Sequence, residues 1–114
     1  MSGISCHVLD TSLGRPAKGL GIVLERCVDQ ADAWVRVSQA TTNADGRALG
    51  LCGSDPLSPG PHRITFETGP YFAEQGQPVF YPEVRVTFVV AETGENYHIP
   101  LLLSPFGYST YRGS

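Results

Sequence analysis

Hydrophobic and polar residues alternate with a period of two over most of this chain. Residues 83–90 show the pattern most clearly, because the apolar positions Val84, Val86, Phe88 and Val90 all fall on one face of an extended segment. Residues 62–67 repeat it, with Ile64 and Phe66 on the apolar face. This period is typical of a half-buried antiparallel strand. The same pattern predicts further strands over residues 4–9, 22–28, 34–38, 97–103 and 108–111.

Turn-forming residues separate these segments. Thirteen glycines and nine prolines divide the chain into short pieces, and turn signals fall at residues 43–46, 58–61, 92–95 and 104–107. One short helix is expected around Tyr71 to Gln75, closed by Gly76 and Pro78. Short strands at this spacing favour a sandwich over alternating βαβ units. We therefore predict an all-β chain, a two-sheet antiparallel β-sandwich of about eight strands with one short helix.

Composition narrows the classes of protein to which the chain can belong. Its 114 residues are enough for a single domain spanning residues 1–114, and 41% hydrophobic with 17% charged residues is typical of a globular protein. A net charge of −3 gives no basic surface for nucleic acid or an anionic membrane. No apolar run approaches the roughly 20 residues of a membrane span.

The N-terminal residues and the cysteines indicate the cellular compartment of the protein. The first residues lack the basic and apolar regions of a signal peptide. The three cysteines, Cys6, Cys27 and Cys52, are odd in number and widely spaced, which is typical of reduced, partly buried thiols. We expect a cytoplasmic protein with no leader and no fused second domain.

Three histidines are candidates for acid–base chemistry near neutral pH. His7 shares a strand face with Ser5 and Leu9, and His98 lies in the penultimate predicted strand. His62 opens a strand directly after a turn, so we expect it to be exposed and without a role. No histidines or cysteines have the close spacing of zinc ligands, and the sequence predicts no metal site.

The remaining candidates are arginines and the C-terminal tetrapeptide. The chain has no nucleophile elbow and no phosphate-binding glycine loop, which leaves histidines that activate water and arginines that bind an anion. Arg47 follows a turn and Arg112 lies near the end of the chain, and each can equally be an exposed residue without a role. Residues 111–114 can hold a polar ligand or form an idle edge.

Three motifs give the chain a family resemblance. They are SCHVLDT at residues 5–11 followed by GRPA at 14–17, TNADGR at 42–47, and YHIPLLLSP at 97–105 with GYSTYRGS at 107–114. With these motifs the chain closely resembles the 5-hydroxyisourate hydrolases, the urate-degrading branch of the transthyretin-like family. Residues 66–81 resemble the short helix of that family and its flanks.

The resemblance implies an assembly and a site. It implies a homotetramer built as a dimer of dimers, with the sites at the dimer–dimer interface, where equivalent surfaces of two subunits meet. No cofactor is implied, and the partner is a small-molecule substrate. The implied catalytic residues are His7, Arg47, His98 and Ser114. The implied substrate-binding residues are the same four together with Tyr111, Arg112 and Gly113.

The resemblance also implies a reaction: hydrolysis of 5-hydroxyisourate to 2-oxo-4-hydroxy-4-carboxy-5-ureidoimidazoline by histidine-assisted attack of water on a ring carbonyl. Which histidine is the base and which the acid stays open. The alternatives are a transthyretin-like carrier of a small aromatic ligand and a purely structural sandwich. The hormone-carrying transthyretins share the fold but lack both histidines, the arginine and the Tyr-Arg-Gly-Ser ending, which favours the hydrolase.

Overall fold

Short strands and one helix make up the described part of the chain. The computed structural model describes residues 3–28, 33–53 and 56–114. The strands are β1 (Gly3–Asp10), β2 (Arg15–Pro16), β3 (Gly21–Val28), β4 (Ala33–Thr41), β5 (Arg47–Ala48), β6 (Gly60–Glu67), β7 (Val84–Val90), β8 (Asn96–Ser104) and β9 (Gly107–Thr110), and the helix is α1 (Thr68–Glu74).

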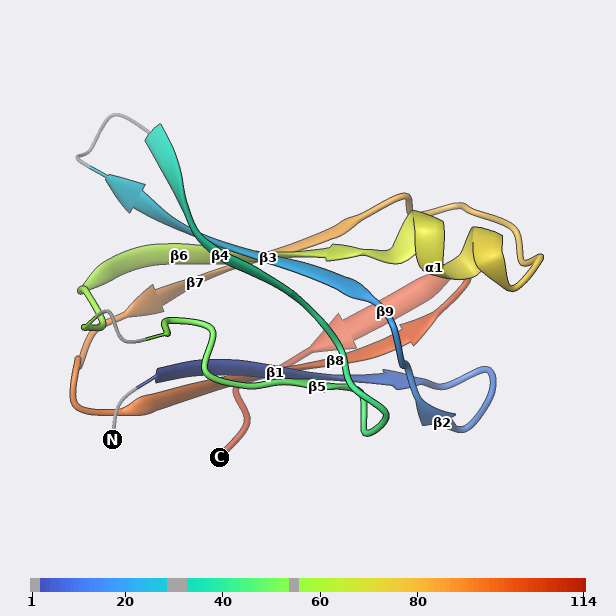
Figure 1. The fold of residues 1–114 in the computed structure, drawn as a ribbon, viewed down its shortest axis with the longest axis horizontal. Coiled ribbons are helices and arrows are strands. Elements are labelled where there is room, and N and C mark those ends of the chain that lie inside the picture. Colours follow the sequence, from blue (N-terminus) through green and yellow to red (C-terminus); the bar gives the residue numbers. More distant parts are fainter. Residues whose placement is uncertain (1–2, 29–32, 54–55) are drawn as a thin grey trace.

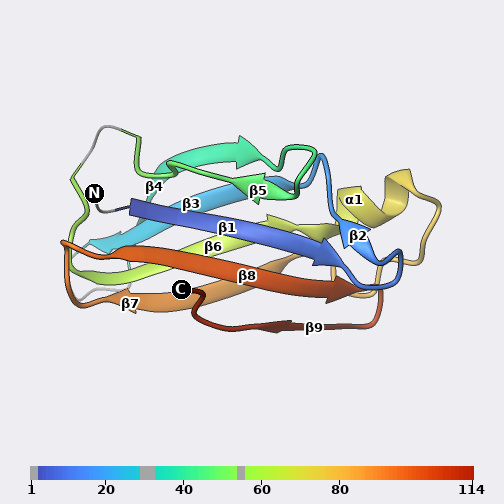
Figure 2. The same ribbon diagram turned by 90° about the horizontal axis from the view of Figure 1, so that it is seen from below.

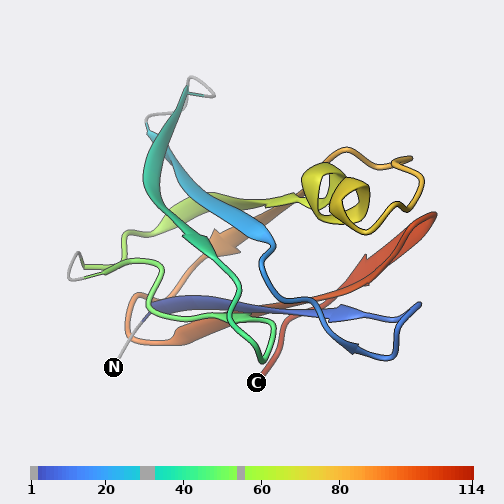
Figure 3. The same cartoon turned by 45° about the vertical axis from the view of Figure 1, so that its right-hand side comes forward.

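The strands form two stacked sheets, so the predicted sandwich is confirmed. One sheet has the order β4-β3-β6-β7, and the other has the order β2-β1-β8-β9, with β5 paired to β1. Figure 1 shows the two layers one above the other, with α1 at the right-hand end of the upper layer, and Figure 3 shows the same layers after a turn. The structure has nine strands in its described part because β2 and β5 are two-residue strands, too short for an alternating pattern to predict.

One feature of the predicted fold is wrong: the sandwich is not purely antiparallel. β1 and β8 pair in parallel, from Gly3 opposite Asn96 to Asp10 opposite Leu103. Neighbours joined by a tight turn are antiparallel, but β1 and β8 come from opposite ends of the chain and no turn sets their direction. Their sheet is therefore mixed, and its centre brings the N-terminal and C-terminal motifs side by side.

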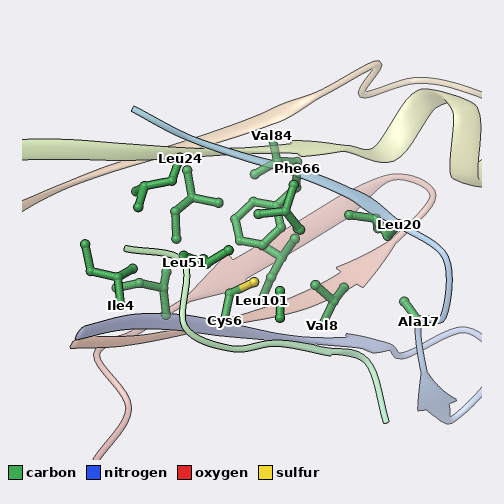
Figure 4. Packing of buried hydrophobic residues seen from close by; sticks show 14 of the residues in the cluster. Ile4, Cys6, Val8, Ala17, Leu20, Leu24, Leu51, Phe66, Val84 and Leu101 are labelled. Atoms are coloured by element: carbon green, nitrogen blue, oxygen red, sulfur yellow. The ribbon is translucent and has the colours of Figure 1, made fainter. Parts of the chain in front are cut away.

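The alternation in β1 decides which side chains reach the outer face. Its even-numbered residues Ile4, Cys6 and Val8 are buried between the sheets, where they meet residues such as Leu24 and Phe66 of the other layer (Figure 4). The odd-numbered residues of β1 are only partly buried. Because successive side chains of a strand point to opposite faces, these odd positions lie on the outer face of the sheet. The histidine of β1 is one of them.

The helix overlaps the predicted one, begins earlier than predicted, and is anchored to β1. It begins three residues before Tyr71, with Pro70 in its first turn, and Gly76 follows it with a positive φ of 69°. The Tyr71 hydroxyl donates to the buried carboxylate of Asp10 at 2.7 Å. With seven residues, α1 is too short to cross a membrane, and the described ranges contain no helix that could.

His62 is buried, contrary to the prediction that it is exposed. It is only 3% accessible, because the even-numbered residues of β6 point between the sheets and His62 shares that face with Ile64 and Phe66. Its Nδ1 donates to the Gly60 carbonyl at 3.0 Å, and its ring stacks on Phe88. Burial lowers the pKa of His62 below its usual range, and the bond to Gly60 opposes this shift. His62 is therefore a neutral core residue.

The predicted partial burial of the cysteines holds for two of the three. Cys6 is buried in the core, and Cys27 and Cys52 are partly buried. Burial raises the pKa of the Cys6 thiol to about 12. Cys6 therefore stays protonated and acts as a small apolar residue of the core.

Candidate active site

A tight turn places Arg47 beside His7. The Asn43 side chain accepts hydrogen bonds from the backbone N–H groups of Asp45 and Arg47, at 2.9 and 3.0 Å. Gly46 has a φ of 73°, and a Cβ there would lie 2.5 Å from the carbonyl oxygen of Val8. Only glycine can therefore bring this turn so close to β1. As a result Arg47 pairs with His7 across β5 and β1.

His98 reaches the same face from the neighbouring strand. Its residue partner across the parallel β1–β8 pair is Ser5, two positions before His7. The Ser5 hydroxyl and Nδ1 of His98 are 2.8 Å apart, within hydrogen-bonding distance. The rings of His7 and His98 have their centroids 6.4 Å apart. The first and third sequence motifs thus contribute one histidine each to a single surface.

The C-terminal segment returns to this surface. After β9 the chain turns back, and its end lies close to β8 in Figure 2. Gly113 donates its backbone N–H to the carbonyl oxygen of His98 at 2.8 Å, forming an isolated β-bridge. This contact brings Ser114, the last residue, to the edge of the same cavity.

A cavity of about 610 Å³ lies between these elements. It is open to solvent and lined by Gly3, Ile4, Ser5, Arg47, Gly50, Cys52, Gly53, Asn96, His98 and Ser114. Three of the four predicted catalytic residues therefore share one cavity. The fourth, His7, is absent from this lining, but its ring neighbours that of His98.

Two predicted substrate-binding residues lie elsewhere in the single chain. Tyr111 and Arg112 line a separate, smaller cavity of about 150 Å³ beside β7 and β8. The Arg112 guanidinium is 3.3 Å from a carboxylate oxygen of Glu95 and stacks over the Tyr97 ring at 4.6 Å. These contacts hold the tail against the domain.

The cavity environment keeps His98 neutral near pH 7. Partial burial lowers the pKa of His98 below its usual range, and the nearby Arg47 and His7 lower it further. A neutral imidazole has one ring nitrogen that can accept a proton and one that can donate. The adjacent guanidinium can bind an anionic or carbonyl oxygen. Together these groups can assist the addition of water to a polarised carbonyl.

Among the lining residues that the sequence does not predict, Ser5 and Asn96 have side chains with oxygen or nitrogen atoms that can form hydrogen bonds. The signal for Ser5 is its position two residues before His7, which puts both side chains on one face of β1. No comparable signal marks Asn96. Among the residues with described positions, no group of three or more His, Cys, Asp or Glu side chains is arranged to hold a metal ion.

Comparison with known proteins defines the family. A family model described as the HIUase/Transthyretin family matches residues 4–113. The chain belongs to this family. A 5-hydroxyisourate hydrolase of Salmonella dublin is 43% identical over 111 residues, which is 97% of this chain and 80% of that protein.

Solved structures of the HIUase/Transthyretin family share the whole fold. A 5-hydroxyisourate hydrolase from Klebsiella pneumoniae superposes with a TM-score of 0.85 at 37% identity, covering 100% of both chains. Sea bream transthyretin in complex with thyroxine gives a TM-score of 0.89 at 27% identity, covering 96% of this chain and 93% of that one. The sandwich therefore serves both kinds of member, and the distinction between them rests on the site residues.

Proposed function

We propose that this chain is a 5-hydroxyisourate hydrolase, which converts 5-hydroxyisourate to 2-oxo-4-hydroxy-4-carboxy-5-ureidoimidazoline in urate degradation. The observation that carries the proposal is the convergence of Arg47, His98 and Ser114 on one cavity, with the His7 ring beside that of His98. The similarity to 5-hydroxyisourate hydrolases that are 43% and 37% identical over nearly the whole of this chain supports the proposal. A carrier of an apolar aromatic ligand would gain little from so polar a lining.

The proposed reaction opens the six-membered ring by adding one water molecule. The water oxygen bonds to the ring carbonyl carbon, and the bond from that carbon to the ring nitrogen then breaks. One water proton passes to the departing nitrogen, the other is released to solvent, and the carbonyl becomes a carboxylate. His7 and His98 manage these protons, a contribution typically worth about 10²- to 10⁴-fold in rate.

Arg47 and Ser114 act on the substrate in this proposal. The Arg47 guanidinium pairs with the carbonyl oxygens and stabilises the negative charge of the addition intermediate, where one donor contributes about 3–4 kcal/mol. Ser114 binds the substrate through its hydroxyl or its terminal carboxylate. Its place at the cavity edge and the Gly113 contact with His98 support this role.

We also propose that the working enzyme is a cytoplasmic homotetramer, a dimer of dimers with the sites at the dimer–dimer interface. In the single chain, the cavity and His7 lie open on the outer face of the β2-β1-β8-β9 sheet. Strands β7 and β9 are both sheet edges, and they carry the exposed apolar side chains of Val89 and Tyr108. Unpaired edges with apolar residues are usually covered in the native assembly. Pairing of these edges would form a dimer, and a second two-fold interface over the outer face of the β2-β1-β8-β9 sheet would enclose the site.

The proposed function is tested by the ultraviolet decay of 5-hydroxyisourate, generated freshly from urate with urate oxidase. The protein should accelerate this decay over the spontaneous rate and give a single enantiomer of the product. His98→Asn should remove most of the acceleration while the protein elutes at the same size on gel filtration. The proposal would be contradicted if the wild-type protein left the decay at its spontaneous rate, or if His98→Asn kept the wild-type acceleration. A carrier would bind an aromatic ligand without accelerating the decay.

A further inference from the structure

The side chain of His98 is held by a residue on a different strand. Ser5 Oγ lies 2.8 Å from Nδ1 of His98, and the two residues are 93 positions apart in the sequence. They are direct partners in the parallel β1–β8 ladder, so both backbones belong to the centre of a sheet. A contact between two central strands keeps its geometry better than one between loops.

The ring of His98 is confined on a second side by the C-terminal segment. A Cβ added to Gly113 would lie 2.6 Å from Cδ2 of His98 and 3.3 Å from Cγ, so the tail backbone is already packed against this edge of the ring. The imidazole is thus held by a hydrogen bond at Nδ1 and has the backbone of Gly113 close to Cδ2. A ring held at both points has little freedom to rotate about its side-chain bonds.

These contacts leave Nε2 as the ring nitrogen without a partner among the described residues. Within the described residues, the ring of His98 makes its one hydrogen bond at Nδ1. No buried side-chain nitrogen or oxygen in those residues lacks a partner, so the unbonded Nε2 is accessible rather than buried. His98 itself lines the cavity, which is where that accessible atom can meet water or substrate.

We propose that Ser5 is a positioning residue for His98: its hydroxyl holds the ring through Nδ1 and so commits Nε2 to proton exchange in the cavity. The proposal rests on the proposed hydrolase function. A neutral imidazole can carry its proton on either nitrogen, and the partner at one nitrogen decides the state of the other. Without Ser5 the ring could exchange tautomers and rotate, and only part of the population would present Nε2 correctly.

A hydroxyl suits this position better than a carboxylate would. It accepts from Nδ1–H of the neutral tautomer whose Nε2 is unprotonated, which is the tautomer that can take a proton from water. When Nε2 takes that proton, Nδ1–H still donates to the Ser5 oxygen, so the bond is kept in both protonation states of the ring. A hydroxyl also adds no negative charge that would favour the imidazolium, which agrees with the low pKa of His98.

Kinetics of three variants test the role. Ser5→Ala should lower kcat on the order of tenfold, as expected for the loss of one positioning hydrogen bond, and leave KM within about twofold. Ser5→Thr keeps a hydroxyl and should restore most of kcat. The matched control is Ser104→Ala on the same strand as His98, which removes one hydroxyl bond to Gly107 far from the ring and should leave kcat unchanged. Wild-type turnover by Ser5→Ala would overturn the proposal.

A spectroscopic measurement separates this proposal from the hydrolase function itself. Long-range ¹H–¹⁵N spectra report the tautomer of each histidine ring, and His98→Asn identifies the signals of His98. The wild type and Ser5→Thr should show one His98 tautomer near pH 7, and Ser5→Ala should show averaged ¹⁵N shifts. Identical His98 shifts in the wild type and Ser5→Ala would overturn the positioning role. A wild type without hydrolase activity would refute the proposed function, and the spectra would still decide the role of Ser5.

Discussion

Replacing Gly113 with alanine should strongly lower hydrolase activity and only slightly lower the stability of the fold. An ideal Cβ at Gly113 would lie 2.6 Å from Cδ2 of His98 and 3.2 Å from Cγ of Pro100. Carbon atoms in contact are normally about 3.5–4.0 Å apart, so the first distance is about 1 Å too short. The backbone of Gly113 does not have a positive φ, and alanine is therefore excluded by space and not by conformation.

The added methyl group must displace either the tail or the ring. The ring is held by Ser5 at Nδ1, so we expect the tail to move by about 1 Å and to lose the 2.8 Å bond from Gly113 to the His98 carbonyl. A shift of this size at a site costs about 10²-fold in rate, and we expect that loss in kcat/KM. Loss of one backbone hydrogen bond at the surface should lower the free energy of unfolding by only about 1 kcal/mol.

Two measurements on the same preparation test this expectation: 5-hydroxyisourate decay and urea unfolding followed by far-ultraviolet circular dichroism. The matched control is Gly94→Ala, because a Cβ at Gly94 meets nothing within 4 Å and its backbone also lacks a positive φ. Gly94→Ala should match the wild type in both assays. If Gly113→Ala hydrolysed substrate at the wild-type rate, the tail would have no part in positioning the site. A loss of several kcal/mol in stability would instead show that the tail holds the fold together.

Three further predictions concern ionisable groups. Because the pKa of His98 is lowered below 6.5, activity that needs the neutral ring should persist below pH 6.5 and fall only as the pH drops through the lowered pKa, which a pH profile of kcat/KM measures. Arg47→Gln removes one cause of the lowering, so NMR titration should show a higher His98 pKa; an unchanged value would contradict this electrostatic reasoning. Asp10→Ala should lower the free energy of unfolding by about 3 kcal/mol in urea, because the buried hydroxyl of Tyr71 and the backbone N–H of Leu13 lose their acceptor. Burial raises the pKa of Asp10, but the hydrogen bonds to its carboxylate outweigh burial and hold the pKa below 3.8. The stability that Asp10 contributes is therefore complete above pH 3.8 and is lost as the pH falls through the pKa of the folded state. A wild-type unfolding midpoint for Asp10→Ala would refute this stabilising role.

The strands that alternate over six or more residues could be predicted from sequence, and the contacts between distant strands could not. The burial of one face in β1, β6 and β7 follows directly from the spacing of apolar residues. The parallel direction of β1 and β8 depends on packing of the whole sandwich, since no turn links them. The exposure predicted for His62 from its position after a turn is wrong, because its place in the alternation of β6 buries it.

The candidate site shows the same division. The motifs identify His7, Arg47 and His98 as candidates, and the structure brings Arg47 and His98 to one cavity with His7 beside them. The hydrogen-bond partner of the His98 ring could not be predicted from the sequence. Ser5 is visible in the sequence only as a hydroxyl two residues before His7, and its bond to His98 depends on the exact register of β1 against β8.

The parallel pairing of β1 with β8 has a consequence for folding. Residues that sit side by side in this ladder, such as Ser5 and His98, are 93 positions apart, so their contact closes a loop of most of the chain. Such non-local pairings form slowly and late, because loop-closure entropy must be overcome before they contribute stability. During synthesis β1 leaves the ribosome long before its partner exists. Hydrolysis should therefore appear as one of the last events of folding, and the recovery of activity after dilution from denaturant should follow the completion of this sheet.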